Sequence, residues 1–391
     1  MLIFLVIGTI VVGAGLFSPP DASDQKDGVK KYKIAMISDS GGINDKSFNQ
    51  NTFEACRNYG TKHGLSYTYF KADNSSEYAL ISMVDLAVAR GYNIIVMPGF
   101  SFAKIIKDVS FKYPEIKFVL LDVNEALICA AAVGSKYYEN PSAYDPAKYY
   151  NKKNTYCAIY QEELSGYMAG YMATKSGYRQ LGFLGGEALP SVIRYGSGFL
   201  QGIDAAAEEL GIADEVSVRY AYAGQFVNST EITAVMDTWY SNGTEVVFSA
   251  GGLIYASVAD AAVKSNGKMI GVDNDQMPLL EAYAKGIVVT SAMKGIKRTV
   301  YDVLDAIIYK GTWEKDYVGR MATLGIVSGT DSDKNYVGLP EGGTQWSERF
   351  TREDYRRLVK DMADGVKKVD PRFDKLPETK VKVQVREGTI M

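Results

Sequence analysis

Two aspartates stand at the ends of short apolar segments of the chain. Asp122 follows the run FVLL, and Asp273 follows the run MIGV. An ionised carboxylate only accepts hydrogen bonds, so at a strand end it either caps the next helix or accepts from the hydroxyl groups of a sugar. Both interpretations stay open for these two residues.

Two phenylalanines occupy corresponding places in the two halves of the chain. Phe48 falls in the first turn of an expected helix, and Phe199 falls near the start of an expected helix that follows Gly185 and Gly186. If both helices point their N-termini at one cleft, the two rings clamp a planar ligand such as a heteroaromatic base. Core packing is the alternative for each ring.

The loop over residues 38–50 reads SDSGGINDKSFNQ. Glycines ahead of a helix let backbone N–H groups approach a ligand, but Asn44 or Asp45 is equally suited to cap that helix. The dinucleotide pattern G-x-G-x-x-G is absent here and at residues 182–186, and the P-loop pattern is absent too. Phosphate-cradling sites are therefore disfavoured.

Histidine and cysteine are scarce for a chain of 391 residues. His63 is the single histidine, and Cys56, Cys129 and Cys157 are scattered without metal-ligand spacing. A Ser-His-Asp triad and the usual zinc sites have no obvious residues, so we expect no enzyme, no metal and no cofactor. The net charge of -3 and the lack of a long basic run argue against nucleic-acid binding.

Residues 1–17 form an almost unbroken apolar run that is typical of a targeting segment, and a polar linker follows to about residue 30. No cysteine precedes Cys56, so a lipid-modified cysteine is not available in this segment. The segment is either cleaved or kept as a signal anchor. Both outcomes place the folded body outside the cytoplasmic membrane and predict membrane association through the N-terminus.

Short apolar segments alternate with helical patterns from residue 33 onward, which predicts an α/β protein with parallel sheets. A Tyr- and Asn-rich insertion at residues 135–154 interrupts this alternation, which then starts again. Two α/β lobes that meet at a cleft are the expected architecture, with ligand groups on loops beyond the carboxyl ends of the strands. We assign residues 31–159 and 274–312 to lobe 1, and residues 160–273 and 313–391 to lobe 2.

The run INDKSFNQ at residues 43–50 resembles a signature of the basic membrane protein family, which includes the PnrA-like purine nucleoside receptors. Further blocks match this family in order, and the resemblance spans residues 33–338: FVLLD (118–122), ELSGYMAGYMA (163–173), residues 181–186 with Pro190, Gly198 and Phe199, VFSAGG (247–252), GVDNDQ (271–276) and SAMK (291–294). The family's lipidated cysteine is absent, and the insertion at residues 137–153 is a second departure that could reshape the cleft rim.

The resemblance implies a type I periplasmic-binding-protein fold, with two Rossmann-like lobes, a ligand cleft and a multi-strand hinge. It implies that Phe48 and Phe199 sandwich a base, that Asp273 holds ribose hydroxyls, and that Asp45 and Asn49 lie near the base and the first-lobe rim. It further implies that Asp122 sits at the cleft wall, that Gly251 and Gly252 bring backbone close to the ligand, and that Lys294 completes the polar shell.

The function expected from these observations is a monomeric extracytoplasmic receptor that delivers a nucleoside, with purines expected, to the permease of an ABC importer. One rival keeps the fold and binds a sugar or another small polar molecule. A second rival is a membrane-anchored sensor ectodomain, and a third is an enzyme such as a nucleoside hydrolase.

Overall fold

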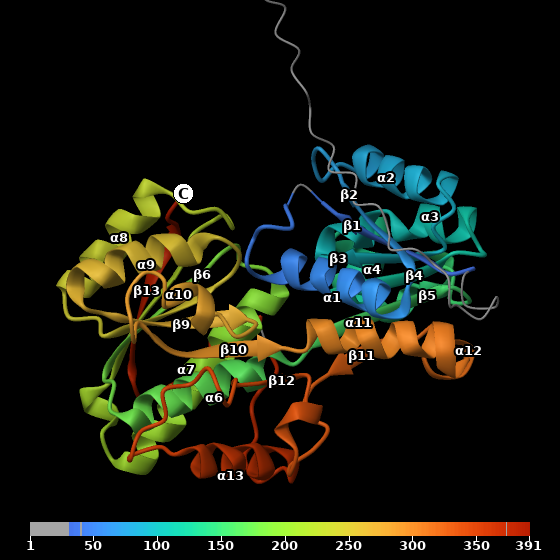
Figure 1. Cartoon of the computed structure of the whole chain (residues 1–391). Coiled ribbons are helices and arrows are strands. Elements are labelled where there is room, and N and C mark those ends of the chain that lie inside the picture. The colour runs from blue at the N-terminus through green and yellow to red at the C-terminus, as the bar shows by residue number, and fades with distance from the viewer. Residues whose placement is uncertain (1–30, 40, 373) are drawn as a thin grey trace, which may run out of the picture.

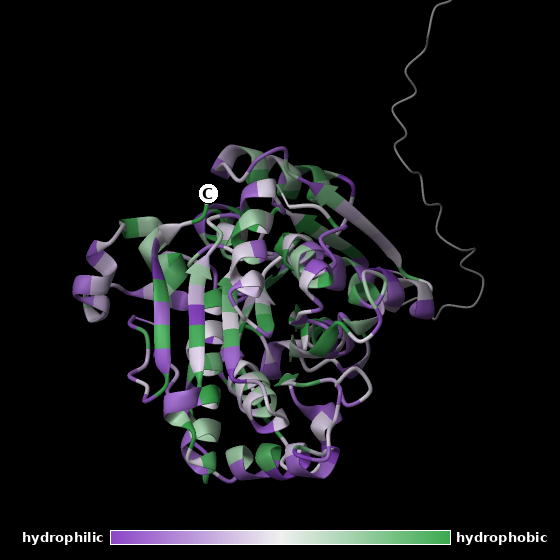
Figure 2. Ribbon diagram, turned by 90° about the vertical axis from the view of Figure 1, so that its left-hand side faces the viewer, coloured by the Kyte–Doolittle hydropathy of each residue, from purple (hydrophilic) through white to green (hydrophobic). Residues whose placement is uncertain are grey.

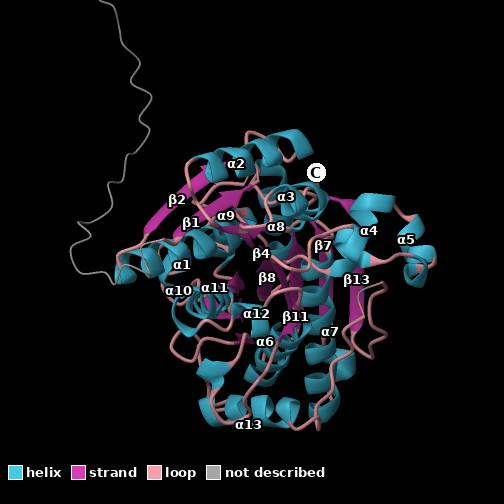
Figure 3. Ribbon diagram, turned by 90° about the vertical axis from the view of Figure 1, so that its right-hand side faces the viewer, coloured by secondary structure: helices cyan, strands magenta, loops and turns pink. Residues whose placement is uncertain are grey.

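The computed structural model describes residues 31–39, 41–372 and 374–391 (Figure 1). The expected targeting segment and linker, residues 1–30, lie outside the described residues. The described chain forms two α/β lobes side by side, each with a central sheet covered by helices (Figures 1 and 3).

The first lobe holds a sheet of six strands whose neighbours all run parallel. Helices cover both faces, which explains why its strands are apolar on both sides. Helices α1 (Phe48–His63) and α11 (Ile296–Asp305) pack on one face, and α2 (Glu77–Ala89), α3 (Ile106–Lys112) and α4 (Glu125–Val133) pack on the other. In sheet order the strands are β11 (Met321–Leu324), β5 (Thr155–Tyr160), β4 (Lys117–Leu121), β3 (Ile94–Pro98), β1 (Lys33–Ser38) and β2 (Ser66–Lys71).

The second lobe holds a sheet of seven strands, of which one edge strand, β12, is antiparallel to its neighbour. One face packs on α6 (Glu162–Ser176), α7 (Pro190–Leu210) and α13 (Arg352–Ala363), and the other on α8 (Thr230–Ser241), α9 (Ile254–Ser265) and α10 (Met277–Leu280). In sheet order the strands are β12 (Val337–Gly338), β10 (Val288–Lys294), β9 (Lys268–Asp273), β8 (Val246–Ala250), β6 (Gln180–Gly185), β7 (Ser217–Tyr222) and β13 (Lys382–Thr389).

The helices that cover the two sheets carry both apolar and polar residues, as half-buried helices do (Figure 2). Shorter helices connect the main elements. The short ones are η1 (Phe100–Lys104), α5 (Lys136–Glu139), η2 (Pro141–Ala143), η3 (Pro146–Lys148), η4 (Ala213–Glu215), the π-helical η5 (Ala306–Lys310), α12 (Trp313–Asp316) and η6 (Ser332–Lys334).

The chain crosses between the lobes three times, after β5, after β10 and after β11. The crossings make a hinge of several segments, but the lobe boundaries differ from those expected. Residues 274–294 stay with the second lobe, because β10 pairs in parallel with β9 and extends that sheet. Residues 321–324 return to the first lobe, because β11 pairs in parallel with β5.

Candidate functional site

A cleft of about 750 Å³ lies between the two lobes, at the carboxyl ends of the strands of both sheets. This volume is typical of a small-molecule site. The first lobe contributes the loops after β1, β3 and β4, and the second lobe contributes those after β6, β7 and β8 together with the ends of β9 and β10. Of the residues expected at the site, the cleft is lined by Asp45, Phe48, Asn49, Asp122, Gly251, Gly252, Asp273 and Lys294.

Phe199 is the exception, and its expected place in an aromatic clamp is wrong. The side chain is fully buried in the second lobe, with its ring centroid 5.3 Å from that of Phe248 and 6.3 Å from that of Phe183. Helix α7 begins at Pro190, so Phe199 lies in its third turn and packs on the sheet rather than at the cleft.

The second lobe presents Phe226 to the cleft in its place. The ring lies so close to two glycines that a Cβ atom added at Gly186 would approach it to 2.4 Å, and one at Gly251 to 2.7 Å. A Cβ at Gly252 would meet the carbonyl oxygen of Phe226 at 2.7 Å. The glycines therefore make room for Phe226. The signal in the sequence was an aromatic residue just beyond a strand and a glycine, since β7 ends at Tyr222 and Gly224 precedes Phe226.

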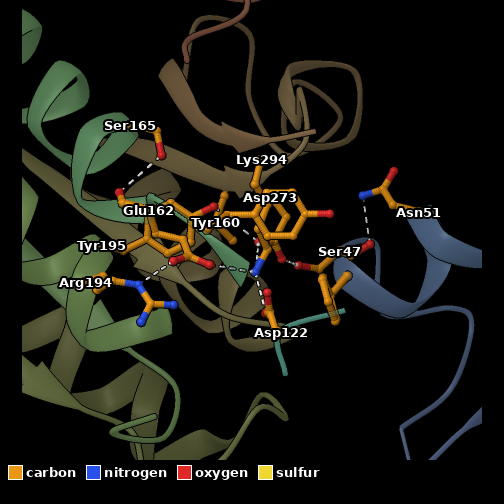
Figure 4. A network of polar contacts seen from close by, with 12 residues as sticks. Ser47, Asn51, Asp122, Tyr160, Glu162, Ser165, Arg194, Tyr195, Asp273 and Lys294 are labelled. Carbon is orange, nitrogen blue, oxygen red and sulfur yellow. Dashed lines mark hydrogen bonds and ion pairs between the residues drawn. The ribbon is translucent and has the colours of Figure 1, made fainter. Parts of the chain in front are cut away.

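Lys294 is the centre of a buried cluster of charges that joins the two lobes (Figure 4). Its Nζ atom lies 2.6 Å from Asp122 Oδ2, 3.5 Å from Glu162 Oε1 and 3.7 Å from Asp273 Oδ1, and its side chain is 3% exposed. The same ammonium lies 4.4 Å from the ring centroid of Phe48, within cation–π distance. Burial alone acts to lower the pKa of Lys294, but the three carboxylates outweigh it and raise that pKa.

Glu162 and Arg194 extend this cluster into the second lobe, and sequence reasoning had assigned neither of them to the site. Arg194 Nε donates to Glu162 Oε2 at 2.7 Å, and both side chains are buried. Burial raises the pKa of Glu162, while Arg194 and Lys294 oppose that rise. Their helices α6 and α7 pack backbone to backbone, since a Cβ at Gly198 would lie 2.0 Å from the carbonyl oxygen of Glu163. Close helix packing therefore fixes the ion pair.

The two strand-end aspartates share an uncommon backbone conformation. Asp122 has φ 58° and Asp273 has φ 66°, in the left-handed region that costs energy for residues with a side chain. Asp122 follows β4 and Asp273 ends β9, so each lobe turns one carboxylate toward Lys294. Within the described structure, the buried atoms Asp122 Oδ1 and Asn49 Oδ1 have no hydrogen-bond partner. Both are hydrogen-bond acceptors whose residues line the cleft.

Three hydrogen bonds link the loop before α1 and its first turn to the end of β9 and the loop that follows it. Ser47 Oγ donates to Asp273 Oδ2 (Figure 4). Asn274 Nδ2 donates to Asn51 Oδ1 at 3.2 Å. Gln276 Nε2 donates to the carbonyl oxygen of Lys46 at 3.0 Å. The first turn of α1 therefore belongs both to the cleft wall and to the contact between the lobes.

The side chain of Asp45 caps helix α1, although the N-cap residue is Ser47 and not Asn44 or Asp45 as expected. Its carboxylate accepts hydrogen bonds from the backbone N–H groups of Ser47, Asn49 and Gln50, at 3.0, 2.9 and 2.9 Å. Burial raises the pKa of Asp45 despite these bonds. The cap holds Phe48 and Asn49 at the cleft.

The insertion reaches the cleft rim through Tyr138, whose side chain lines the cleft and is 59% exposed. The remainder of the insertion is attached to the first lobe. Tyr150 is buried in its core, and Asn154 Nδ2 donates to the carbonyl oxygen of Ser110 at 3.0 Å. The insertion therefore adds an aromatic side chain to the rim.

The residues that sequence reasoning set aside lie elsewhere in the described structure. His63 contacts the rings of Tyr59 and Tyr309 at the end of α1. All three cysteines are buried and unpaired, and among the described residues no group of His, Cys, Asp and Glu has an arrangement that could hold a metal ion. None of the helices described is both long and apolar enough to span a bilayer.

Residues 31–341 match the family described as PnrA-like ABC transporter substrate-binding proteins. The chain is 26% identical to the ABC transporter nucleoside-binding protein BmpA of Lactococcus lactis, over 77% of this chain and 82% of BmpA. It is 23% identical to an uncharacterized lipoprotein of Pyrococcus furiosus, over 86% of this chain and 79% of that protein.

The fold is also similar to that of a solved ABC transporter solute-binding protein from Conexibacter woesei. The TM-score is 0.64 at 19% sequence identity, and the match covers 88% of this chain and 100% of the other. This likeness confirms the expected type I periplasmic-binding-protein fold.

Proposed function

The chain belongs to the family of PnrA-like ABC transporter substrate-binding proteins, and we propose that it is an extracytoplasmic receptor that closes its two lobes on a nucleoside. A purine nucleoside is the first ligand to test. The closed, loaded form would dock as a monomer on the permease of an ABC importer. The apolar N-terminal segment and the similarity to a lipoprotein support a location at the outer side of the cell membrane.

One juxtaposition supports this proposal most strongly. The ring of Phe48 lies next to a lysine that bridges Asp122 and Asp273, so an aromatic surface adjoins two carboxylates. A nucleoside has the matching division, because its base stacks on aromatic rings and its ribose hydroxyls donate to carboxylates. In this arrangement Phe48 and Phe226 contact the base, while Asp122 and Asp273 accept from the ribose and Lys294 holds both carboxylates in place.

The cleft also has an excess of negative charge close to Lys294. Asp122, Asp273 and Glu162 surround one lysine, and Arg194 is engaged with Glu162. Such surroundings repel a phosphate and favour a neutral ligand that donates hydrogen bonds. The proposed ligand is therefore a free nucleoside rather than a nucleotide.

Calorimetry of the purified protein with inosine, guanosine, adenosine, uridine and ribose tests the proposal. Binding of at least one nucleoside, with ribose much weaker, is the expected result. Equal binding of ribose would favour the sugar-binding rival, and no binding of any nucleoside would refute the proposal. The enzyme rival is tested by incubating the protein with inosine. Release of free hypoxanthine would show hydrolase activity, and we expect none.

A further inference from the structure

Strand β13 lies at the edge of the second sheet and beyond the residues that match the family. It pairs in parallel with β7, in register from Lys382 with Ser217 to Val385 with Tyr220. Its side chains are mostly exposed, and Lys382, Arg386 and Glu387 are charged, which suits an edge strand that must not pair with another chain. These charges protect the edge of the sheet, and the first half of the strand pairs regularly.

The second half of β13 departs from that simple pairing. Thr389 pairs with Tyr222, so four steps along β13 correspond to two steps along β7. Gly388 within this bulge has φ 69°, in the left-handed region. Bulges redirect a strand and are common beside functional sites. This one directs the segment 389–391 past the end of β7.

The redirected segment contacts the loop that carries Phe226. The N–H of Ile390 donates to the carbonyl oxygen of Tyr222, and the N–H of Met391 donates to that of Ala223, both at 3.0 Å. At Gly224 the chain has φ 87°, and a Cβ there would lie 2.9 Å from the side chain of Thr389. The two segments are therefore in direct contact immediately before the cleft residues.

The loop is held on its other side by the second lobe itself. The N–H of Gly224 donates to the carbonyl oxygen of Gly186 at 3.0 Å, and the N–H of Leu253 donates to that of Phe226 at 2.8 Å. Gln225, Phe226 and Val227 all line the cleft. The loop is thus held between Gly186 and Leu253 on one side and the segment 389–391 on the other.

We propose that Thr389, Ile390 and Met391 are positioning residues, which hold the loop 223–227 so that Phe226 faces the cleft. They touch no ligand and act through Phe226 alone. For the identity of the ligand the inference rests on the proposed function. We expect that loss of the contacts made by residues 389–391 weakens the binding of a base and leaves the binding of a sugar unchanged.

The variant Ile390→Pro tests this inference, because proline removes the N–H that donates to Tyr222. Its matched control is Ile390→Ala, which keeps the N–H and loses only side-chain packing. We expect Ile390→Pro to lower the affinity for the bound nucleoside about fivefold relative to Ile390→Ala, as for the loss of one hydrogen bond. Affinity for ribose should stay equal in the two variants. A second variant that ends at Thr389 repeats the test should the proline variant fail to fold.

Hydrogen exchange of residues 223–229 gives a readout that needs no ligand. We expect residues 223–229 to exchange faster in Ile390→Pro than in Ile390→Ala, while the exchange rates of residues 246–250 are the same in both variants. Equal exchange in the two variants would overturn the inference, and so would faster exchange with unchanged nucleoside affinity. If the unmodified protein binds no nucleoside, the proposed function fails, while the exchange experiment still decides whether the segment 389–391 holds the loop.

Discussion

Ser47 of the first lobe donates a hydrogen bond to Asp273 of the second, and the same carboxylate lies 3.7 Å from Lys294 Nζ. One side chain thus takes part in the contact between the lobes, in the buried charge cluster and in the lining of the cleft. A ligand that donates to Asp273 adds to interactions that already hold the lobes together. In the proposed function, binding and closure would therefore be coupled through this residue.

Ser47→Ala removes the donor to Asp273 while leaving the backbone of the α1 N-terminus intact. We expect the closed form to lose about 1 kcal/mol relative to the open form, as for one hydrogen bond. Small-angle X-ray scattering of the ligand-free variant should show a larger radius of gyration. Ser191→Ala changes a serine elsewhere on the cleft wall and serves as the control. Identical scattering of the two variants would show that the Ser47 bond does not hold the lobes together.

Lys294→Met leaves three carboxylates without the cation that they surround. Removing one partner of a buried ionic cluster typically costs about 3–5 kcal/mol. The free energy of unfolding in urea should fall by about this amount. Lys297→Met is the matched control, since Lys297 pairs with Glu54 at 2.8 Å but is half exposed. An exposed pair contributes at most about 1 kcal/mol, so equal losses in the two variants would contradict a central role for Lys294.

The parts of the site that followed from the sequence are those fixed by local pattern. Asp122 and Asp273 end apolar strands, and parallel strands bring their carboxyl ends to one edge of a sheet. Phe48 opens helix α1 as expected, while its place at the cleft was implied by the family resemblance and not by the local pattern alone.

The parts that could not be predicted depend on where helices begin and which partners they meet. Phe199 was misplaced because α7 begins at Pro190, which moves the ring to the third turn. The ion pair of Glu162 with Arg194 depends on the close packing of α6 on α7. The lobe boundaries depend on which sheet β10 and β11 join, and strand pairing between distant segments has no local signature.

We expect Glu163 to make the stability of the protein depend on pH. Burial raises the pKa of this carboxyl from its usual 4.5 to about 7. The unfolded chain releases the proton first, so the contribution of Glu163 to stability is fully present below about pH 4.5 and is lost as pH rises to about 7. The loss is on the order of 3 kcal/mol. Urea unfolding at about pH 5 and pH 8 measures it.

Glu163→Gln removes this dependence, because the amide stays neutral in both the folded and the unfolded chain. We expect the variant to lose less stability between about pH 5 and pH 8 than the unmodified protein does. Glu209→Gln is the control with the opposite sign. Burial acts to raise the pKa of Glu209, but Lys175, Lys367 and Tyr171 lower it to about 2, so its contribution is lost only in stronger acid. An unchanged pH profile in Glu163→Gln would contradict the assignment.

The variants Phe226→Ala and Phe199→Ala distinguish an aromatic residue that lines the cleft from one that packs in the core of the second lobe. Stacking of a base on an aromatic side chain contributes about 1–3 kcal/mol, so Phe226→Ala should lower nucleoside affinity about tenfold or more and leave ribose affinity unchanged. Phe199 is fully buried, so Phe199→Ala should cost about 3–5 kcal/mol of unfolding free energy. Calorimetry and urea unfolding measure both effects. A folded Phe199→Ala variant that loses base binding as strongly as Phe226→Ala would restore the sandwich expected from the sequence.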